Sequence, residues 1–309
     1  MLRTTLLAAA NRPRLRRWLE AAPGGRAVVA RFVAGQDAAA VVRVAEELAG
    51  DRLRVTIDHL GEDITDPSHA ARTVEEYVKL IDLFREANLA ERPDVSIKLS
   101  ALGQALPTEG DEVAYRNAVE VCRAAERVGA TVTLDMEDHT TTDSTLAILD
   151  RLRGDFPSVG VAVQARLRRT EADCVRLAET GSRVRLCKGA YAEPPEVAFQ
   201  QRTEVNQSFR QCMEILFGGP GYPMIASHDP AVIRHAQELV ERHGRAVGDH
   251  EFQMLYGVRP AEQRRLAAGG HTVRVYLPYG ADSTAYFLRR LAERPANVAF
   301  FLRALTGRR

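Results

Sequence analysis

The chain has 309 residues, a length that fits one large α/β domain or two smaller ones around a sizeable buried core. Its 42 basic and 41 acidic residues leave a formal net charge of +1, which excludes a global field that would recruit nucleic acid or an anionic membrane. Partners must therefore be inferred from local sites, and the sequence sets no oligomeric state.

The chain has four cysteines with no C-x-x-C pair among them: Cys122, Cys174, Cys187 and Cys212. This spacing favours reduced thiols in a cytoplasmic protein over a disulfide framework or a zinc ribbon. Residues 1–10 faintly resemble a signal peptide, but the apolar run is short and residues 11–13 interrupt it, so we expect a helix there. No run approaches the ~18 apolar residues of a membrane span.

Residues 1–50 have the pattern of helices. Leu15, Trp18 and Leu19 stand at helical spacing, and further apolar residues repeat in the same way up to Leu48. Glycine and proline near residues 23–25 separate the pieces. We expect an N-terminal helical segment over 1–50 that packs against a catalytic domain over 51–309.

From residue 51 the chain alternates between short β-rich runs and amphipathic helices. The predicted strands are 53–57, 95–100, 131–137, 159–164, 183–188, 224–228, 251–256 and 273–276. The predicted helices between them are 71–87, 111–128, 144–153, 171–179, 196–217, 231–243 and 259–268. Eight strands that alternate with helices over about 250 residues predict an α/β fold of the (βα)8 TIM-barrel type.

An open doubly wound sheet is the alternative fold. Such a sheet usually has a glycine-rich phosphate turn after its first strand, whereas here Ile57 is followed by Asp58-His59-Leu60-Gly61-Glu62. No G-x-G-x-x-G sequence occurs in the chain. The barrel is therefore favoured.

Polar residues stand where the predicted strands end. They are Lys98, Asp135, Glu137, Gln164, Arg185, Lys188, Ser227, His228, Gln253, Tyr276 and Tyr279. In a barrel the carboxyl ends of the strands meet at one mouth, where the chemistry is placed. So many converging polar groups predict a functional site at this mouth.

Several chemistries could use such a mouth. Asp135, Glu137 and His139 invite a metal site, but the chain lacks H-x-H at the first strand and H-E-x-x-H, so a hydrolytic site would be incomplete and we predict no metal. Lys98 or Lys188, desolvated in the barrel, could form a Schiff base in an aldolase or lyase. Residues 227–229 read Ser-His-Asp, but sequence neighbours seldom supply the geometry of a triad.

The last strand leads through Pro278 and Gly280, which predict a turn, into a helix that begins near residues 282–284. One face of this helix carries Tyr286, Arg289, Arg290 and Glu293, at i, i+3, i+4 and i+7. Two adjacent guanidinium groups form a fork that can grip a planar carboxylate. A solvated basic helix face is the alternative.

Three stretches together resemble the proline dehydrogenase family: residues 183–191 (RVRLCKGAY), 252–257 (FQMLYG), and 276–280 (YLPYG) with Tyr286-x-x-Arg289-Arg290-x-x-Glu293. The match runs in register from about residue 53 to residue 297. The resemblance implies a monofunctional, FAD-dependent enzyme whose last helix lies over the barrel mouth. The resemblance also implies roles for individual residues at the substrate and cofactor sites.

For the substrate, the resemblance implies that Arg289 and Arg290 bind the carboxylate and that Glu293 holds them. It also implies that Tyr286 and Leu255 pack on the pyrrolidine ring. Lys98 and Tyr279 are further implied substrate-site residues, and Asp135, Arg185 and Tyr276 are implied catalytic residues. The implied FAD contacts are Met136, Gln164, Arg185, Lys188, Gly189, Ala190, Ser227 and His228.

The implied reaction oxidises L-proline to 1-pyrroline-5-carboxylate, the first step of proline catabolism to glutamate, by hydride transfer to FAD. Cationic neighbours such as Arg185 and Lys188 would stabilise a reduced flavin. The resemblance further implies that electrons pass to a membrane quinone. The chain has no room for the extra domains of bifunctional relatives, so we expect handover of the product to a separate pyrroline-5-carboxylate dehydrogenase.

The sequence departs from the family pattern at two places. Residues 281–284 lack an aromatic residue that many relatives have, and Ser227 stands where threonine is common. Neither departure removes a catalytic group, although the part of the protein that covers the flavin can differ from that of other family members.

We expect a cytoplasmic protein, with peripheral contact to the membrane as an option. Val298, Phe301, Leu302 and Leu305 stand at helical spacing near arginines and could touch a membrane, or this tail could pack on the barrel. Two other functions stay open: the Schiff-base aldolase or lyase, and a non-catalytic barrel that binds an amino acid.

The arginine pair gives a first test. Replacing Arg289 or Arg290 by Met should raise the KM for proline strongly, because a charge-assisted hydrogen bond contributes about 1.5 to 3 kcal/mol. Steady-state kinetics measures the change. A KM within twofold of the wild-type value would contradict the role of the pair in binding the carboxylate.

Overall fold

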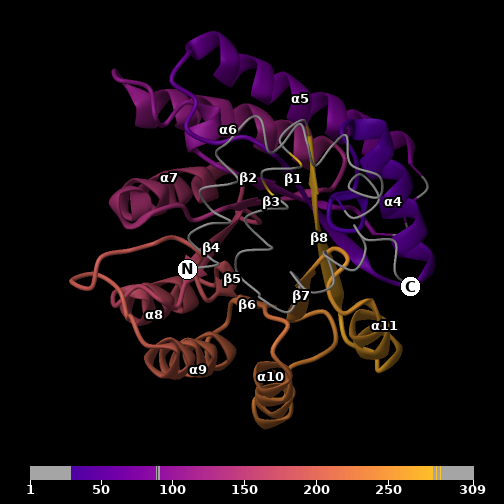
Figure 1. Ribbon diagram of the computed structural model, residues 1–309, viewed down its shortest axis with the longest axis vertical. Helices are drawn as coiled ribbons and strands as arrows, with labels where there is room; N and C mark the ends of the chain where they lie inside the picture. Colours follow the sequence, from indigo (N-terminus) through magenta and orange to yellow (C-terminus); the bar gives the residue numbers. More distant parts are fainter. Residues whose placement is uncertain (1–28, 88, 90, 281–282, 284–285, 287–309) are drawn as a thin grey trace, which may run out of the picture.

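A computed structural model describes residues 29–87, 89, 91–280, 283 and 286, and the following account concerns these residues. Within them, eight parallel strands close into a barrel in chain order, with β8 pairing back to β1. The strands are β1 (Arg54–His59), β2 (Asp94–Ile97), β3 (Thr131–Leu134), β4 (Gly160–Gln164), β5 (Arg183–Cys187), β6 (Tyr222–Ala226), β7 (Glu251–Leu255) and β8 (Val273–Tyr279). The predicted barrel is confirmed (Figure 1).

Helices surround the barrel on its outside, and most of them connect one strand to the next (Figure 1). They are α4 (Ala38–Gly50), α5 (Pro67–Glu86), α6 (Gly110–Arg127), α7 (Thr142–Asp155), α8 (Thr170–Glu179), α9 (Arg202–Gly218), α10 (Pro230–Arg242) and α11 (Pro260–Ala268). Short 3-10 turns η1 (Ser100–Leu102) and η2 (His139–Thr141) follow β2 and β3. Asp66 and Asp229 cap α5 and α10, each before a proline at the first helical position, which is the favoured order.

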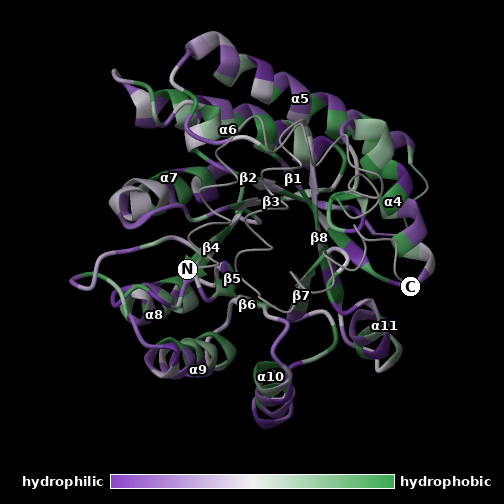
Figure 2. Ribbon diagram, viewed as in Figure 1, coloured by the Kyte–Doolittle hydropathy of each residue, from purple (hydrophilic) through white to green (hydrophobic). Residues whose placement is uncertain are grey.

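The hydrophobic core lies between the strands and the helices. Outward-facing strand residues such as Ile57 and Ile97 are fully buried against helix residues such as Leu80 and Phe84 of α5. Figure 2 shows that apolar residues gather on the helix faces toward the barrel, while polar residues lie outside. This is the amphipathic pattern that the sequence predicted.

The barrel interior has a different composition. Its inward-facing residues include buried charged and polar side chains that contact one another: Thr56, Asp94, Ser96, Thr133, Arg185, Glu251, Gln253 and Arg274. Branched apolar residues usually fill this space in such barrels. Here ion pairs and hydrogen bonds fill much of it, which prepares a polar site above.

The chain before α4 closes the rim beside β7 and β8. The amide of Ala34 donates to the carbonyl of Pro278 at 2.9 Å, and the amide of Gly280 donates to the carbonyl of Gly35 at 3.1 Å. Gly257, after β7, has φ +73°, and a Cβ there would lie 1.9 Å from the carbonyl oxygen of Arg31. Only glycine lets the two backbones approach this closely.

Two predicted boundaries are wrong: the start of the helix over 196–217 and the end of the last strand. The predicted helix 196–217 begins at Arg202, because residues before it pair with the loop after β4: Leu167 and Ala198 form a bridge, and the amide of Phe199 donates to Arg166. The last strand does not turn at Pro278 but continues to Tyr279. β7 ends at Leu255, opposite Tyr276, so Pro278 lies at an edge position where proline is tolerated.

Two strands are also shorter than predicted. β2 ends at Ile97, because the amide of Ala101 turns back to the carbonyl of Lys98 and opens η1. β3 ends at Leu134 rather than residue 137. The predicted site residues Lys98 and Asp135 therefore stand just beyond the strands.

The last predicted helix lies outside the described residues except for Ser283 and Tyr286, which have helical conformation. Its placement over the mouth stays a prediction. No helix in the described ranges is long and apolar enough to cross a membrane.

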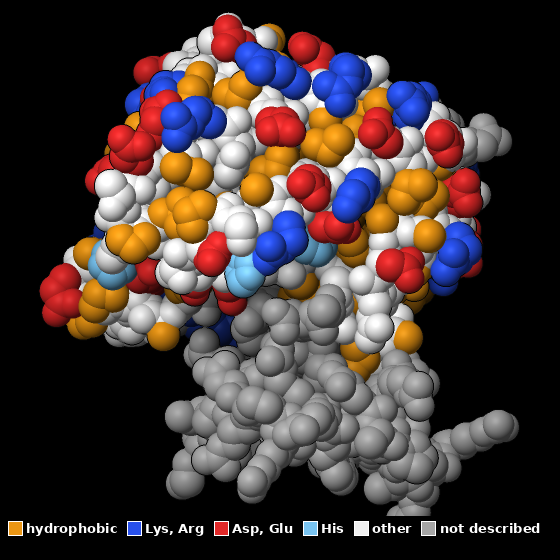
Figure 3. All heavy atoms as spheres, turned by 90° about the horizontal axis from the view of Figure 1, so that it is seen from above, with side chains coloured by type: hydrophobic (Ala, Val, Ile, Leu, Met, Phe, Trp, Pro, Cys, Tyr) orange, Lys and Arg blue, Asp and Glu red, His pale blue; other side chains and the backbone are white. Residues whose placement is uncertain are grey.

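The outer surface mixes charges of both signs on the face shown in Figure 3, in accord with the balanced composition.

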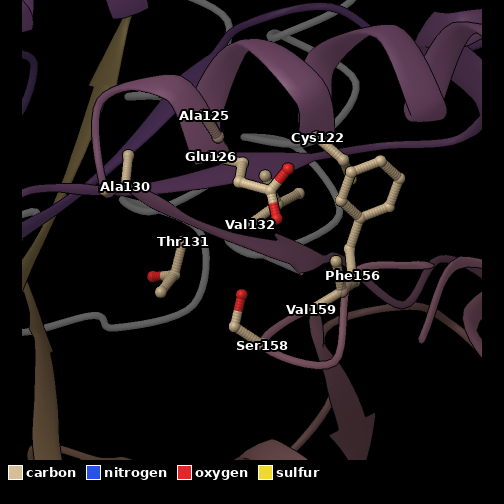
Figure 4. A pocket seen from close by; sticks show the side chains of 10 residues that line it. Cys122, Ala125, Glu126, Ala130, Thr131, Val132, Phe156, Ser158 and Val159 are labelled. Carbon is tan, nitrogen blue, oxygen red and sulfur yellow. The ribbon is translucent and has the colours of Figure 1, made fainter. Parts of the chain in front are cut away.

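A small cleft of about 230 Å³ lies at the amino-terminal end of β3, next to the end of α6 and the turn before β4 (Figure 4). Cys122, Glu126 and Phe156 are among its lining residues. It is remote from the carboxyl ends of the strands, where barrel enzymes place their chemistry.

His250, just before β7, predicts an acid limit to stability. Its ring is buried between Phe217 and Phe252, and burial lowers its pKa from 6.5 to about 4. The unfolded chain therefore binds this proton first as pH falls, and stability is lost between about pH 6.5 and 4. At about 1.4 kcal/mol per pKa unit the loss of unfolding free energy is at most roughly 3.5 kcal/mol.

Urea unfolding of His250→Leu at pH 7.5 and pH 5 should show a smaller loss of stability on acidification than in the wild type. His243→Gln, at an exposed histidine after α10, is the control and should keep the wild-type slope. Equal slopes in all three proteins would contradict the assignment.

Candidate active site at the carboxyl end of the barrel

Asp135 is the centre of a cluster at the barrel mouth. Its carboxylate accepts hydrogen bonds from Ser96 at 2.8 Å, from Arg185 at 2.7 Å and from the hydroxyl of Tyr276 at 2.8 Å. The ammonium of Lys98 lies 3.7 Å away. Residues within or just after β2, β3, β5 and β8 thus converge, and four predicted site residues come together.

The protonation states in this cluster follow from its charges. Burial opposes ionisation of Asp135, but Arg185 and Lys98 lower its pKa overall. Burial, followed by the charge of Asp135, raises the pKa of Tyr276 well above its usual value. Tyr276 is therefore a neutral hydrogen-bond donor and Asp135 a carboxylate acceptor.

Lys98 forms a short ion pair with Asp58, whose carboxylate lies 2.6 Å from the ammonium nitrogen and is 2% exposed. Burial disfavours the charged ammonium, but Asp58 and Asp135 raise the pKa of Lys98 above its ordinary value. Burial raises the pKa of Asp58. Lys98 therefore carries a positive charge rather than the neutral amine that a Schiff base needs.

The guanidinium of Arg185 is held on several sides. Its Nε donates to Gln253 at 2.7 Å, Nη1 donates to Ser96 at 2.7 Å as well as to Asp135, and Nη2 donates to Asp94 at 3.1 Å. The side chain is 5% exposed, and the guanidinium carbon lies 5.3 Å from the centre of the Tyr276 ring. So many partners fix both the position and the charge of the group.

Gln164 and Gly189 lie together at the ends of β4 and β5. The amide of Gln164 donates to the carbonyl of Glu137 at 2.7 Å. Gly189 has φ +94°, and a Cβ there would lie 3.0 Å from the side-chain oxygen of Gln164. A larger residue would crowd this part of the mouth.

Lys188 and His228 continue the rim toward β6 and β7. The ammonium of Lys188 contacts Asn206 at 2.7 Å and Asp229 at 3.5 Å. The Nε2 of His228 accepts a hydrogen bond from the amide of Leu255 at 2.8 Å, so this nitrogen carries no proton. Met136 and Ala190, two further predicted cofactor contacts, follow β3 and β5 in the same set of loops.

The Ser-His-Asp sequence at 227–229 does not form a relay. The hydroxyl of Ser227 accepts from the amide of Asp229 at 3.2 Å, and Asp229 caps α10. Because His228 binds the amide of Leu255, its Nε2 is not available to a serine. This agrees with the sequence argument against a triad.

The metal interpretation of 135–139 also finds no matching geometry. Asp135 is occupied by Arg185, whereas Glu137 accepts from the hydroxyl of Ser100 at 2.6 Å. His139 pairs instead with Glu193 on the loop after β5, at 2.5 Å. Among the described residues, no three His, Cys, Asp or Glu side chains are placed to hold a metal ion.

The predicted substrate residues are only partly brought together. Leu255 ends β7 at the mouth and is partly exposed. Tyr286 is buried, 7% exposed, against Val33 and Leu60. Arg289, Arg290 and Glu293 lie outside the described residues.

Tyr279 does not join the mouth cluster. It alternates with Tyr276 and Pro278 along β8 and points outward, where its ring centre lies 5.0 Å from that of His59. It is buried in the core between the barrel and α5, together with Tyr77. The prediction that it contacts substrate rested on its neighbours in the sequence, while the added residues of β8 set its direction.

Sequence reasoning missed three residues that hold the cluster. Asp58 pairs with Lys98, while Ser96 and Asp94 bind Arg185. A signal was present, because Asp94, Ser96 and Lys98 alternate and must face the same side of the strand. Buried carboxylates at such positions indicate cationic partners inside the barrel.

A buried set of carboxylates, cations and a phenol at the carboxyl end of a closed barrel defines a (βα)8-barrel enzyme site. The family model of proline dehydrogenase matches residues 41–303. This chain belongs to the proline dehydrogenase family, which confirms the resemblance inferred from the sequence.

Two relatives and one solved structure agree with this family assignment. Proline dehydrogenase of Deinococcus radiodurans is 38% identical over 277 residues, which is 89% of each chain. Proline dehydrogenase 1 of Bacillus subtilis strain 168 is 35% identical over 91% of this chain and 92% of that one. The crystal structure of proline utilization A from Bdellovibrio bacteriovorus inactivated by N-propargylglycine has a similar fold, with a TM-score of 0.81 at 24% identity. It covers 87% of this chain, which spans 33% of that longer one.

The Lys98–Asp58 pair predicts a large cost for removing one partner. Lys98→Met leaves Asp58 buried beside Asp135 without its cation, so we expect a loss of about 3 to 5 kcal/mol in unfolding free energy. The double variant Asp58→Asn/Lys98→Met should regain part of this loss. Urea unfolding measures both.

Lys79→Met is the matched control, since Lys79 pairs with Glu76 at 3.0 Å on the exposed face of α5. Its cost should be much smaller than that of Lys98→Met, because an exposed ion pair contributes little to stability. If Lys98→Met costs no more than this control, the buried pair does not have the role described.

Proposed function

We propose that this protein is an FAD-dependent proline dehydrogenase that oxidises L-proline to 1-pyrroline-5-carboxylate. The observation that carries the proposal is the mouth cluster of Asp135, Arg185, Tyr276 and Lys98 in a chain of this family. These residues offer a fixed cation, a neutral phenol and an ammonium group in one small space. Such a set suits an anionic substrate beside a group that gains negative charge.

The rim of β4 to β6 fits the isoalloxazine part of FAD. Its donors and cations, Gln164, Arg185 and Lys188, match the oxygen and nitrogen acceptors on the pyrimidine edge of a flavin. Gly189 keeps the space beside Gln164 clear, which a Cβ would fill. We propose that Met136, Ala190, Ser227 and His228 complete the contacts.

When bound, FAD supplies the electron-accepting chemistry of the reaction. The protein must then hold the proline ring in a fixed orientation, since reacting atoms need to approach to roughly 3 to 3.5 Å. We propose that Arg289 and Arg290 bind the carboxylate, with Glu293 holding them. Leu255 and Tyr286 would exclude water from the ring.

Lys98 is proposed to bind the substrate by charge. Its ammonium is kept protonated beside Asp58 and Asp135, so it can attract a carboxylate without forming a covalent bond. The same charge counts against a Schiff-base aldolase or lyase at Lys98. For Lys188, contacts with Asn206 and Asp229 support a role as a fixed cation.

We propose a membrane quinone as electron acceptor and a separate pyrroline-5-carboxylate dehydrogenase as the consumer of the product. Both proposals rest on the family. We also propose the division into a helical segment over 1–50 and a catalytic domain over 51–309, with α4 of the segment packed against α5 and β1 of the domain. A cytoplasmic location with peripheral membrane contact completes the proposal.

A visible spectrum tests the function directly. The purified protein should be yellow, and its flavin band should bleach when L-proline is added without oxygen, because electrons move to the cofactor. A protein that binds FAD but does not bleach would refute the substrate, and one that binds no FAD would refute the cofactor.

Borohydride tests the remaining enzyme hypothesis, because in a Schiff-base lyase it would trap the substrate covalently on a lysine.

Arg242→Met is a useful control for Arg289→Met. Arg242 lies on α10 with an exposed partner, Glu214, so its replacement should leave bleaching by proline unchanged.

A further inference from the structure

Asp94 is a buried carboxylate beneath the site, with no part in the proposed reaction. It begins β2, faces the barrel interior and is 0% exposed. One of its oxygens accepts from Thr131 at 2.6 Å, and the other accepts from Thr56 at 2.9 Å. The hydroxyl of Thr133 lies 3.0 Å from both oxygens.

These threonines come from β1 and β3, the two strands beside β2. Three hydroxyl groups therefore fix the carboxylate from both sides, in a place without bulk water. Burial of an ionised carboxylate is costly unless it is both hydrogen-bonded and paired with a cation. The cation is Arg185, whose Nη2 lies 3.1 Å away.

Arg185 has carboxylates on two sides, and they differ in their other partners. Asp135 is shared among Arg185, Lys98 and Tyr276. In the part of the chain that the structure describes, Asp94 forms an ion pair with Arg185 and with no other cation. Asp94 is thus the counter-charge of Arg185 on the side away from Asp135, and at longer range its charge also favours the charged form of Arg274.

The rest of the guanidinium is held by neutral groups, Ser96 and Gln253. Gln253 is fixed in turn by Glu251, which pairs with Arg274 at 2.8 Å. Arg185 therefore cannot turn away from Asp94 without breaking several bonds. The field that it projects toward the mouth depends on how much of its charge Asp94 offsets.

We propose that Asp94 is a positioning residue that sets the effective positive charge of Arg185 and so lowers the reduction potential of the bound flavin. This inference rests on the proposed function, because it requires FAD next to Arg185. A cation near a flavin stabilises its reduced, anionic form and raises the potential. A buried counter-charge beneath that cation acts in the opposite direction.

Asp94→Asn tests the inference in the full-length protein loaded with FAD. The amide has the shape of the carboxylate, and the threonine hydroxyls can rotate to suit it. The midpoint potential should move to more positive values, and sulfite should bind the oxidised flavin several-fold more tightly, because its adduct is anionic. Both readouts are independent of turnover.

Thr131→Val is the matched control. It removes one hydrogen bond to Asp94 but no charge, so the potential should stay near the wild-type value even if the melting temperature falls. Asp94→Glu keeps the charge and should also remain near wild type. Loss of stability and change of potential are thereby separated.

The outcomes divide cleanly. A wild-type flavoprotein bleached by proline, with unchanged potential and sulfite affinity in Asp94→Asn, would overturn the inference and leave the proposed function intact. A wild-type protein that binds no FAD would overturn the proposed function. Should Asp94→Asn fail to fold, Asp94→Thr takes its place, and an unchanged potential in that variant would overturn the inference in the same way.

Discussion

The structure depends on a set of buried charges that neutralise one another inside a closed barrel. Arg185 and Arg274 face Asp94 and Glu251, and Gln253 links the two pairs. Each charge would be very costly to bury alone. Removing any one of them therefore leaves its partner buried without a counter-charge, at the full desolvation cost. The site at the mouth is built on this network, since Arg185 belongs to both.

The hydrophobic and polar parts of the fold have separate tasks. Apolar packing between the strands and the surrounding helices supplies the cohesion of the domain. The polar interior contributes little net stability, because Coulomb attraction and desolvation largely cancel. What it provides is orientation: Asp135, Tyr276 and Lys98 are held by partners whose protonation is fixed by their neighbours. A catalytic group held in this way needs little reorganisation during reaction.

The barrel and much of its mouth could be predicted because parallel strands alternate with amphipathic helices and end in polar residues. Asp135, Arg185 and Tyr276 were found in this way, and they do meet. Tyr279 was misplaced because the strand runs three residues further than its apolar run, and direction on a strand depends on register. Asp94 alternates with Ser96 and Lys98 on one face of the strand, but it was missed because this pattern does not identify a partner, and Arg185 lies 91 residues away in the sequence.

The rim contacts of the N-terminal segment have a consequence for biosynthesis. Gly35 pairs with Gly280, and 280 − 35 = 245 residues separate them, so nearly the whole chain must emerge from the ribosome before this contact can form. Contacts so distant in sequence are late and slow to form. The N-terminal residues at the mouth are therefore synthesised early but are among the last to be fixed in place. Until then the nascent barrel stays open between its first and last strands, β1 and β8.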